Sequence, residues 1–200
     1  MRTGRLEAFS DGVLAIVITI MVLELDVPET GSLDALLPVL PTFVAYVLSF
    51  LYVGIAWNNH HHLLALSRRR DATVLWANLH LLFWISLIPF ASGWLGRAGL
   101  DSPGPAALYG TVLLMMGVAY SVLQHRILRA EPDDAPIARE IGRDLKGRAS
   151  IGLYLAAIGL AFVAPLASVA LYTAVALLWT VPDRRLERAW AAANDEEDRE

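Results

Sequence analysis

The stretch RLEAFSDGVLAIVITI, residues 5–20, contains the apolar run of a membrane-spanning helix, yet it keeps a carboxylate, Asp11, directly beside that run. The charge-free part covers only residues 12–23, and acidic residues follow it. A helix needs about 20 residues to cross the hydrocarbon core of a bilayer. The flanking residues must therefore belong to the span, and we expect a helix over about 6–26 whose first turns are polar.

Four further stretches contain no Asp, Glu, Lys or Arg: 35–67, 72–96, 102–125 and 149–182. The chain is 56% hydrophobic and its mean hydropathy is +0.50, whereas a soluble domain is about 45–50% apolar. Lipid provides no hydrogen-bond partner for backbone groups, and the runs lack the alternation of strands, so helices are expected. The composition predicts an all-α protein of the lipid bilayer.

Basic residues gather near residues 2–5, 68–70, 126–148 and 184–188, whereas the 24–38 connection contains only acidic charges. The positive-inside rule places these basic zones, and both termini, in the cytoplasm. The 149–182 run has basic residues at both ends. A single helix of its length would span about 50 Å and would place its two basic ends on opposite sides of the membrane. Two shorter spans that turn near Pro165 explain both the length of the run and the basic residues at its two ends, because proline ends helices.

This reasoning predicts six transmembrane helices in one domain over 1–183 and a charged cytoplasmic tail over 184–200. A short surface helix is also expected over 31–37. The expected spans are about 6–26, 39–66, 72–95, 105–127, 149–165 and 167–182.

Polar side chains recur where the second and third predicted spans meet the 68–70 turn. The second span ends in WNNHHH, residues 57–62, and the third begins with WANLH, residues 76–80. The two spans form an antiparallel hairpin, so these residues share a depth in the cytoplasmic half, where Asp11 also lies. Ionisable groups inside a membrane usually mark a functional site or a paired interior network. We expect one polar layer shared by three helices.

The first helix has a separate apolar stripe. At about 100° per residue, Ile16, Ile20 and Leu23 lie within roughly 60° of one another, Thr19 flanks them, and Asp11 lies nearly opposite. If several copies directed this stripe to a common axis, they would form a hydrophobic constriction, at which channels gate by dewetting. The alternatives are ordinary packing or lipid contact for the apolar side chains, and a bond from Thr19 to a preceding carbonyl.

Other polar residues also have structural alternatives. Ser10 and Asp11 are typical helix caps, and Trp57 and Trp76 are typical interfacial anchors. The histidines at 60–62 are poorly arranged for a metal, because adjacent helical residues point about 100° apart. With no cysteine and no convergent nucleophile in the chain, we expect neither an enzyme nor a metal or cofactor. Residues 109–112, YGTV, are not the Thr-Val-Gly-Tyr-Gly filter of potassium channels.

Several of these residues form a pattern that resembles the lysosomal potassium channel family, transmembrane protein 175, and especially its bacterial members. The matching elements are Arg5-x-x-x-Phe9-Ser10-Asp11 in the first span, Trp57-x-x-His60 in the second, and Asn78-Leu79 and Pro89-Phe90 in the third. The match covers the first three helices well, and the last three agree only in number and placement.

The resemblance implies a cation channel without a filter loop, in which four chains assemble and their first helices line the pore. Ile16 would be the main constriction, Ile20 and Leu23 further apolar layers, and Thr19 the polar residue that favours potassium. The family's hydrogen-bonded network, which holds the first helix, would comprise Arg5, Ser10, Asp11, Trp57, His60 and Asn78.

The leading hypothesis is thus a potassium-preferring, homotetrameric, multi-pass channel of the cell membrane. It would conduct potassium and other monovalent cations and would bind no nucleic acid. Glu24 and Asp26 would concentrate cations at its outer mouth. The alternative is a secondary ion-coupled transporter with Asp11 and His60 as coupling residues. Transporters of that kind use internal repeats and broken helices, and we expect neither a repeat nor a broken helix in the first three spans.

Overall fold

The computed structural model describes residues 3–65, 71–130 and 145–180, and within them all regular structure is helical. This confirms the all-α class for the described part of the chain; the predicted tail over 184–200 lies outside it. The elements are α1 (Thr3–Leu23), the 3-10 helix η1 (Leu33–Leu36), α2 (Leu40–Ala65), α3 (Ala72–Ser86), α4 (Ile88–Ala98), α5 (Pro103–Ala130), α7 (Leu145–Ala161) and α8 (Pro165–Thr180). The helix η1 matches the short helix expected over 31–37.

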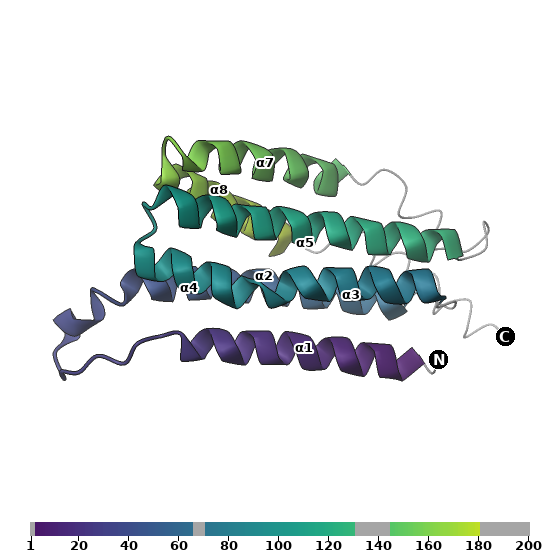
Figure 1. The fold of residues 1–200 in the computed structure, drawn as a ribbon, viewed down its shortest axis with the longest axis horizontal. Coiled ribbons are helices and arrows are strands. Elements are labelled where there is room, and N and C mark those ends of the chain that lie inside the picture. The colour runs from purple at the N-terminus through teal and green to yellow at the C-terminus, as the bar shows by residue number, and fades with distance from the viewer. Residues whose placement is uncertain (1–2, 66–70, 131–144, 181–200) are drawn as a thin grey trace.

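The helices run along the long axis of the molecule, with α1 at one edge and α7 and α8 at the other (Figure 1). Helix α1 packs on α2, α3 and α4, and α5 joins α3 and α4 to α7 and α8. The beginning of α1 and the ends of α2 and α5 lie at one end of the bundle; we call it the N-terminal end (Figure 1). The end of α1 lies toward the opposite end, which we call the distal end.

The third predicted span contains a break, so the expectation of unbroken helices there was wrong. Helix α3 ends at Ser86, and α4 begins at Ile88. Pro89 explains the break, because it has no N–H to donate and its ring clashes with the carbonyl four residues earlier. The Leu87 N–H instead bonds to the Trp84 carbonyl at 3.2 Å. The apolar stretch continues across the break to Ala98.

The long apolar run near the end of the chain is divided as predicted. Helix α7 ends at Ala161 and Pro165 is the first residue of α8, where its fixed backbone angle suits a helix start. These two helices have 17 and 16 residues, at or just below the lower end of the spanning range. Four helical segments of the described residues are long and apolar enough to cross a membrane: 4–23, 40–65, 72–98 and 103–130.

Helix α3 begins with a side-chain cap. The Asp71 carboxylate accepts hydrogen bonds from the Val74 backbone N–H at 2.9 Å and from the Thr73 hydroxyl at 2.7 Å. An N-cap aspartate satisfies an amide that has no partner in the first helical turn. These bonds stabilise the carboxylate and lower the pKa of Asp71 below its usual value. The cap fixes where the chain re-enters the bundle after α2.

Buried tyrosines join α2 to α5 and both of these helices to α8, where the Tyr172 hydroxyl donates to the Ala106 carbonyl of α5 at 3.2 Å. Tyr52 donates to the Tyr172 carbonyl at 2.7 Å, and the Tyr109 hydroxyl lies 2.9 Å from that of Ser49. Each of these tyrosines is at most 2% exposed, and a buried hydroxyl that lacked such a partner would destabilise the fold. The bonds fix the position of α8 relative to the helices that pack on α1.

Two glycines permit close contacts between helices. A Cβ atom at Gly96 in α4 would lie 2.5 Å from the Cα atom of Thr42 in α2. A Cβ atom at Gly110 would lie 1.9 Å from the Tyr172 hydroxyl oxygen. Small residues at helix contacts are typical of membrane bundles, where packing rather than the hydrophobic effect holds helices together.

Candidate functional site

The predicted apolar stripe of α1 lies on the outside of the chain. Ile16 is 58% exposed, Ile20 43% and Leu23 81%, whereas Leu14 and Val17 on the other side of the helix are almost fully buried. Both sides of α1 are thus apolar, but only one packs against the chain's own helices. The exposed side has no partner within the described residues.

Two further residues share this exposed side, and the sequence reasoning did not place them there. Phe9 is 54% exposed, and Arg5 is exposed as well. At about 100° per residue, Phe9 and Arg5 each lie roughly 20° from Ile16 around the helix. The helical-wheel argument that grouped Ile16 with Leu23 could have found both, had it been extended toward the N-terminus.

Thr19 is exposed beside the stripe, and its hydroxyl donates to the Ile16 carbonyl at 2.9 Å. The alternative considered above, a bond back to a preceding carbonyl, is therefore what the structure shows. This bond uses the hydroxyl hydrogen, and the oxygen keeps its capacity to accept. In this geometry Thr19 presents an acceptor, the group that a cation requires.

A chain of buried hydrogen bonds joins α1, α3 and α2. The Ser10 hydroxyl donates to the Leu6 carbonyl at 2.9 Å and accepts from the Asn78 amide nitrogen at 3.0 Å. The amide oxygen of Asn78 lies 2.6 Å from His60 Nε2. Because an amide oxygen only accepts, His60 Nε2 holds the hydrogen and donates it. Ser10, Asn78 and His60 are at most 3% exposed.

Asp11 forms a second contact between α1 and α2. The Trp57 indole N–H donates to the Asp11 carboxylate at 3.0 Å. Trp57 also stacks on His61, with ring centres 6.0 Å apart and planes inclined by 23°. Helix α1 begins at Thr3, so Ser10 and Asp11 lie beyond its first turn. The alternative in which they cap the helix is therefore excluded by the geometry.

The predicted polar layer is only partly assembled. Arg5 makes no side-chain hydrogen bond or ion pair with the described residues, because it points roughly 140° away from Ser10 around α1. On α3, Trp76 is 73% exposed. His80 lies on the outside and accepts a bond from the Trp84 indole at 2.9 Å. Of the predicted third-span residues, only Asn78 faces α1.

The three consecutive histidines have three different partners. His60 bonds to Asn78, His61 stacks on Trp57, and the Nδ1 atom of His62 lies 2.7 Å from the Asn58 carbonyl. The His61 and His62 rings also meet edge to face, with ring centres 5.8 Å apart. No group of three potential metal ligands was found among the described residues.

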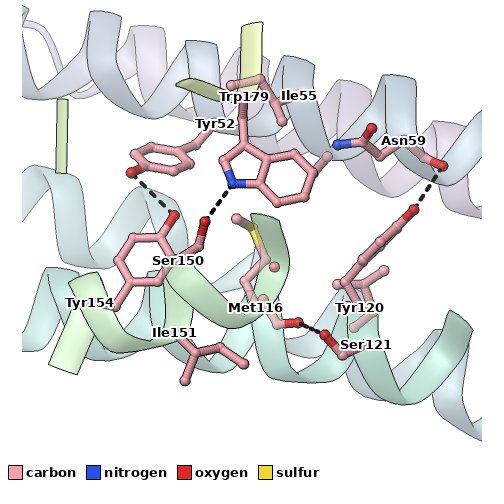
Figure 2. A pocket seen from close by; sticks show the side chains of 14 residues that line it. Tyr52, Ile55, Asn59, Met116, Tyr120, Ser121, Ser150, Ile151, Tyr154 and Trp179 are labelled. Carbon is pink, nitrogen blue, oxygen red and sulfur yellow. Dashed lines mark hydrogen bonds between the residues drawn. The ribbon is translucent and has the colours of Figure 1, made fainter. Parts of the chain in front are cut away.

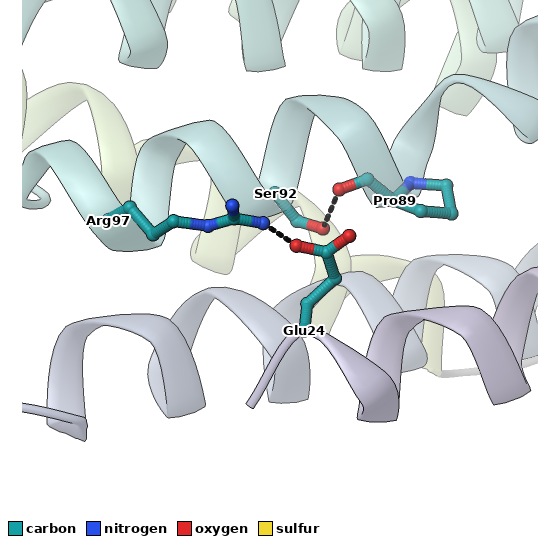
Figure 3. A network of polar contacts seen from close by, with 4 residues as sticks. All are labelled: Glu24, Pro89, Ser92 and Arg97. Carbon is teal, nitrogen blue, oxygen red and sulfur yellow. Dashed lines mark hydrogen bonds and ion pairs between the residues drawn. The ribbon is translucent and has the colours of Figure 1, made fainter. Parts of the chain in front are cut away.

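The distal end of α1 is held by an ion pair that the sequence did not reveal. Glu24, directly after the helix, pairs with Arg97 of α4 (Figure 3). The Glu24 N–H also closes the last turn on the Met21 carbonyl at 3.3 Å. Arg97 offsets the negative charge that was expected of Glu24 at an outer mouth. Asp26, the other residue expected there, is exposed and makes no side-chain bond with the described residues.

We expect replacement of Asn78 by leucine to lower the stability of the protein. The change keeps the branched shape of the side chain but removes the hydrogen bonds that Asn78 makes with Ser10 and His60, at a cost of roughly 2 kcal/mol. For a chain of this size that lowers the midpoint of thermal unfolding by roughly 4–8 °C. Asn58→Leu is the control, because the Asn58 side chain makes no hydrogen bond with the described residues. Equal shifts in the two variants would contradict the role assigned to Asn78.

Charge reversal tests the ion pair at the distal end. Glu24→Arg and Arg97→Glu each place like charges side by side and are expected to destabilise the protein, whereas the double variant restores the attraction. The pair is partly exposed, so the coupling measured by thermal unfolding should be at most about 1 kcal/mol. Asp26→Arg combined with Arg97→Glu is the control. If this combination also restored stability, general electrostatics rather than the pair would be responsible.

The chain is similar in sequence to known ion channels. Residues 5–89 match the family model described as the endosomal/lysosomal potassium channel TMEM175. A protein of Chryseobacterium sp. (strain P1-3) that is named a potassium channel is 48% identical over 94% of this chain and 98% of its own length. The mouse endosomal/lysosomal proton channel TMEM175 is 39% identical over 99 residues, which is 44% of this chain and 20% of that protein.

The fold also matches a solved structure. The crystal structure of a lysosomal potassium-selective channel TMEM175 homolog from Chamaesiphon minutus is 30% identical to this chain. The TM-score is 0.77, and the match covers 90% of this chain and 96% of that one. The similarity thus extends to the last helices, where the sequence pattern was weakest.

Proposed function

This chain belongs to the TMEM175 family of ion channels, and we propose that it is a potassium-preferring cation channel of the cell membrane. It has no Thr-Val-Gly-Tyr-Gly filter. The observation that supports this proposal best is the exposed apolar side of α1 formed by Ile16, Ile20 and Leu23. Lipid or another protein surface can cover such a side, and the similarity of the chain to a TMEM175 channel homolog favours copies of the same helix.

In the proposed channel four chains form a ring and their α1 helices surround the pore. Ile16 forms the narrowest ring, and Ile20 and Leu23 form further apolar layers toward the distal end. Water leaves a sufficiently narrow apolar ring, and ions then cannot pass, so Ile16 is the gate and the selectivity element. Thr19 presents its hydroxyl oxygen beside the ring and favours potassium.

The two polar contacts at the N-terminal half of α1 set the orientation of that ring. Ser10 bonds through Asn78 to His60, and Asp11 bonds to Trp57, so α1 is fixed to both α2 and α3. A rotation of the helix about its axis would break both contacts. These residues therefore act as positioning residues and do not touch the ion.

The proposed topology has six spans and both termini in the cytoplasm, with α3 and α4 together as one span and α7 and α8 as two short ones. The N-terminal end of the bundle is then cytoplasmic and the distal end is external. Arg126 and Arg129, near the end of α5, lie on the proposed cytoplasmic side, as the positive-inside rule requires. The charged residues of the 24–38 connection lie outside.

Reconstitution into liposomes tests the proposed function. Purified protein in vesicles loaded with potassium is expected to release potassium down its gradient without any second solute, faster than sodium from matched vesicles. Protein-free vesicles are the control, and light scattering should give four chains per particle. Release of protons alone, or of no ion, would refute the potassium channel.

Asp11→Ala distinguishes the channel from the ion-coupled transporter. In the channel Asp11 only anchors α1, so passive flux persists in the variant and still needs no second solute. In the transporter Asp11 and His60 would exchange the coupling ion, so flux would require a second solute and would be lost. In the structure Asp11 bonds to Trp57 and His60 bonds to Asn78, and this separation favours the channel.

A further inference from the structure

A cavity of about 70 Å³ is lined by residues of α2, α3, α5, α7 and α8 (Figure 2). Helices α7 and α8 lie at the opposite edge of the bundle from α1 (Figure 1). It extends from Tyr52 and Tyr154 toward Asn59 and Tyr120, which lie closer to the N-terminal end of the bundle. For comparison, an engineered cavity of about 150 Å³ holds one benzene molecule. The space thus suits a thin, flexible group better than a bulky ring system.

The polar groups around the cavity are mostly bonded to one another. Tyr154 donates to the Tyr52 hydroxyl at 3.3 Å, and the Trp179 indole donates to the Ser150 hydroxyl at 2.8 Å. The Tyr120 hydroxyl donates to a backbone carbonyl of α2 at 3.3 Å. These contacts leave aromatic rings and aliphatic side chains as the main lining, as Figure 2 shows. A lining of this kind binds apolar groups.

A positive charge lies next to this apolar space. The Lys146 ammonium is 4.6 Å from the centre of the Trp179 ring, and Trp179 is part of the cavity wall. Lys146 belongs to the first turn of α7, which lies on the proposed cytoplasmic side of the membrane. The cytoplasmic leaflet contains the anionic lipids that attract basic residues near membrane helices.

We propose that this cavity binds a short segment of one hydrocarbon chain of an anionic phospholipid whose headgroup lies beside Lys146. The segment occupies the apolar space, and the phosphate is attracted by the ammonium. Transfer of the chain from bilayer to cavity provides little hydrophobic free energy, because lipid tails are as apolar as the lining. The charge of Lys146 therefore determines which lipid binds. This inference depends on the membrane orientation proposed above and not on ion conduction.

Native mass spectrometry of the purified protein, titrated with phosphatidylglycerol or phosphatidylcholine, tests the site. Gly117 lies in the cavity wall and a Cβ atom there would meet nothing within 4 Å, so Gly117→Leu adds a side chain that reduces the space from a position where the Cβ atom has room. We expect its affinity for phosphatidylglycerol to fall on the order of tenfold, or about 1.4 kcal/mol. Gly159→Leu is the matched control, because Gly159 is exposed on α7, has equal room and lies outside the cavity.

Lys146→Gln is a second, independent variant that leaves the cavity open. We expect it to bind phosphatidylcholine as the wild type does but to lose the preference for phosphatidylglycerol. Equal lipid binding by the wild type and Gly117→Leu, or an unchanged lipid preference in Lys146→Gln, would overturn the proposal. Potassium release from liposomes is measured in parallel, and because lipid binding is read by mass, failure of the lipid site and failure of the channel are distinguishable.

Discussion

Ile16→Asn is expected to raise the passive potassium flux into or out of liposomes on the order of tenfold, which corresponds to a barrier about 1.4 kcal/mol lower. The asparagine amide bonds to water, so the ring proposed at this position stays hydrated and a cation crosses it with less loss of its own hydration. The potassium preference over sodium should fall at the same time, because a wetted ring no longer requires ions to shed water.

Leu155→Asn is the matched control for this experiment. Leu155 is 57% exposed and Ile16 is 58% exposed, but Leu155 belongs to α7, at the opposite edge of the bundle from α1 (Figure 1). The control introduces the same polar group on an equally exposed apolar position. If Leu155→Asn raised the flux as much, or Ile16→Asn left both flux and selectivity unchanged, Ile16 would not be the constriction.

Gly96→Val should be the most destabilising single substitution among those considered. The added Cβ atom would lie 2.5 Å from the Cα atom of Thr42. A backbone atom cannot move aside by a rotamer change, as the end of a flexible side chain can. Helices α2 and α4 must separate, and overpacking of this kind costs about 3 kcal/mol or more. For a chain of this size the midpoint of thermal unfolding should fall by roughly 6–12 °C.

Gly54→Val provides the comparison within the same helix pair. A Cβ atom at Gly54 in α2 would meet nothing within 4 Å, so the variant has the same added side chain and the same change of helix propensity. Its unfolding midpoint should stay within a few degrees of the wild type. A similar loss in both variants would mean that valine itself, and not the contact with Thr42, destabilises the bundle.

The sequence was sufficient for features that depend on composition and local spacing. Charge-free runs indicated the helices, and Pro165 indicated the turn between the last two. Matching depth in the hairpin brought Asn78 and His60 together, and the position of Asp11 before the apolar run placed it near Trp57. These inferences use composition, residues that are close in sequence, or residues at a matching depth in the membrane.

Other features were not predictable because they depend on side-chain direction or on distant contacts. The family resemblance grouped Arg5 with Ser10 in one network, although the two side chains point to different sides of the helix. The pair between Glu24 and Arg97 joins residues with three helices between their positions in the chain, and no local pattern indicates it. The break before Pro89 has a local signal in the proline itself, and it was missed because the apolar run continues across it.

Helix α1 is attached to the rest of the chain by a connection whose only regular element is the single turn η1. Residues such as Val27 and Gly31 in this connection are exposed, and the closure entropy of such a loop changes only slowly with its length. The side-chain contacts of α1, and not this connection, therefore determine its position. The segment 27–31 is accordingly the place where an inserted epitope or a protease site would be tolerated. A chain cut there is expected to remain assembled, with α1 behaving as a separable subunit.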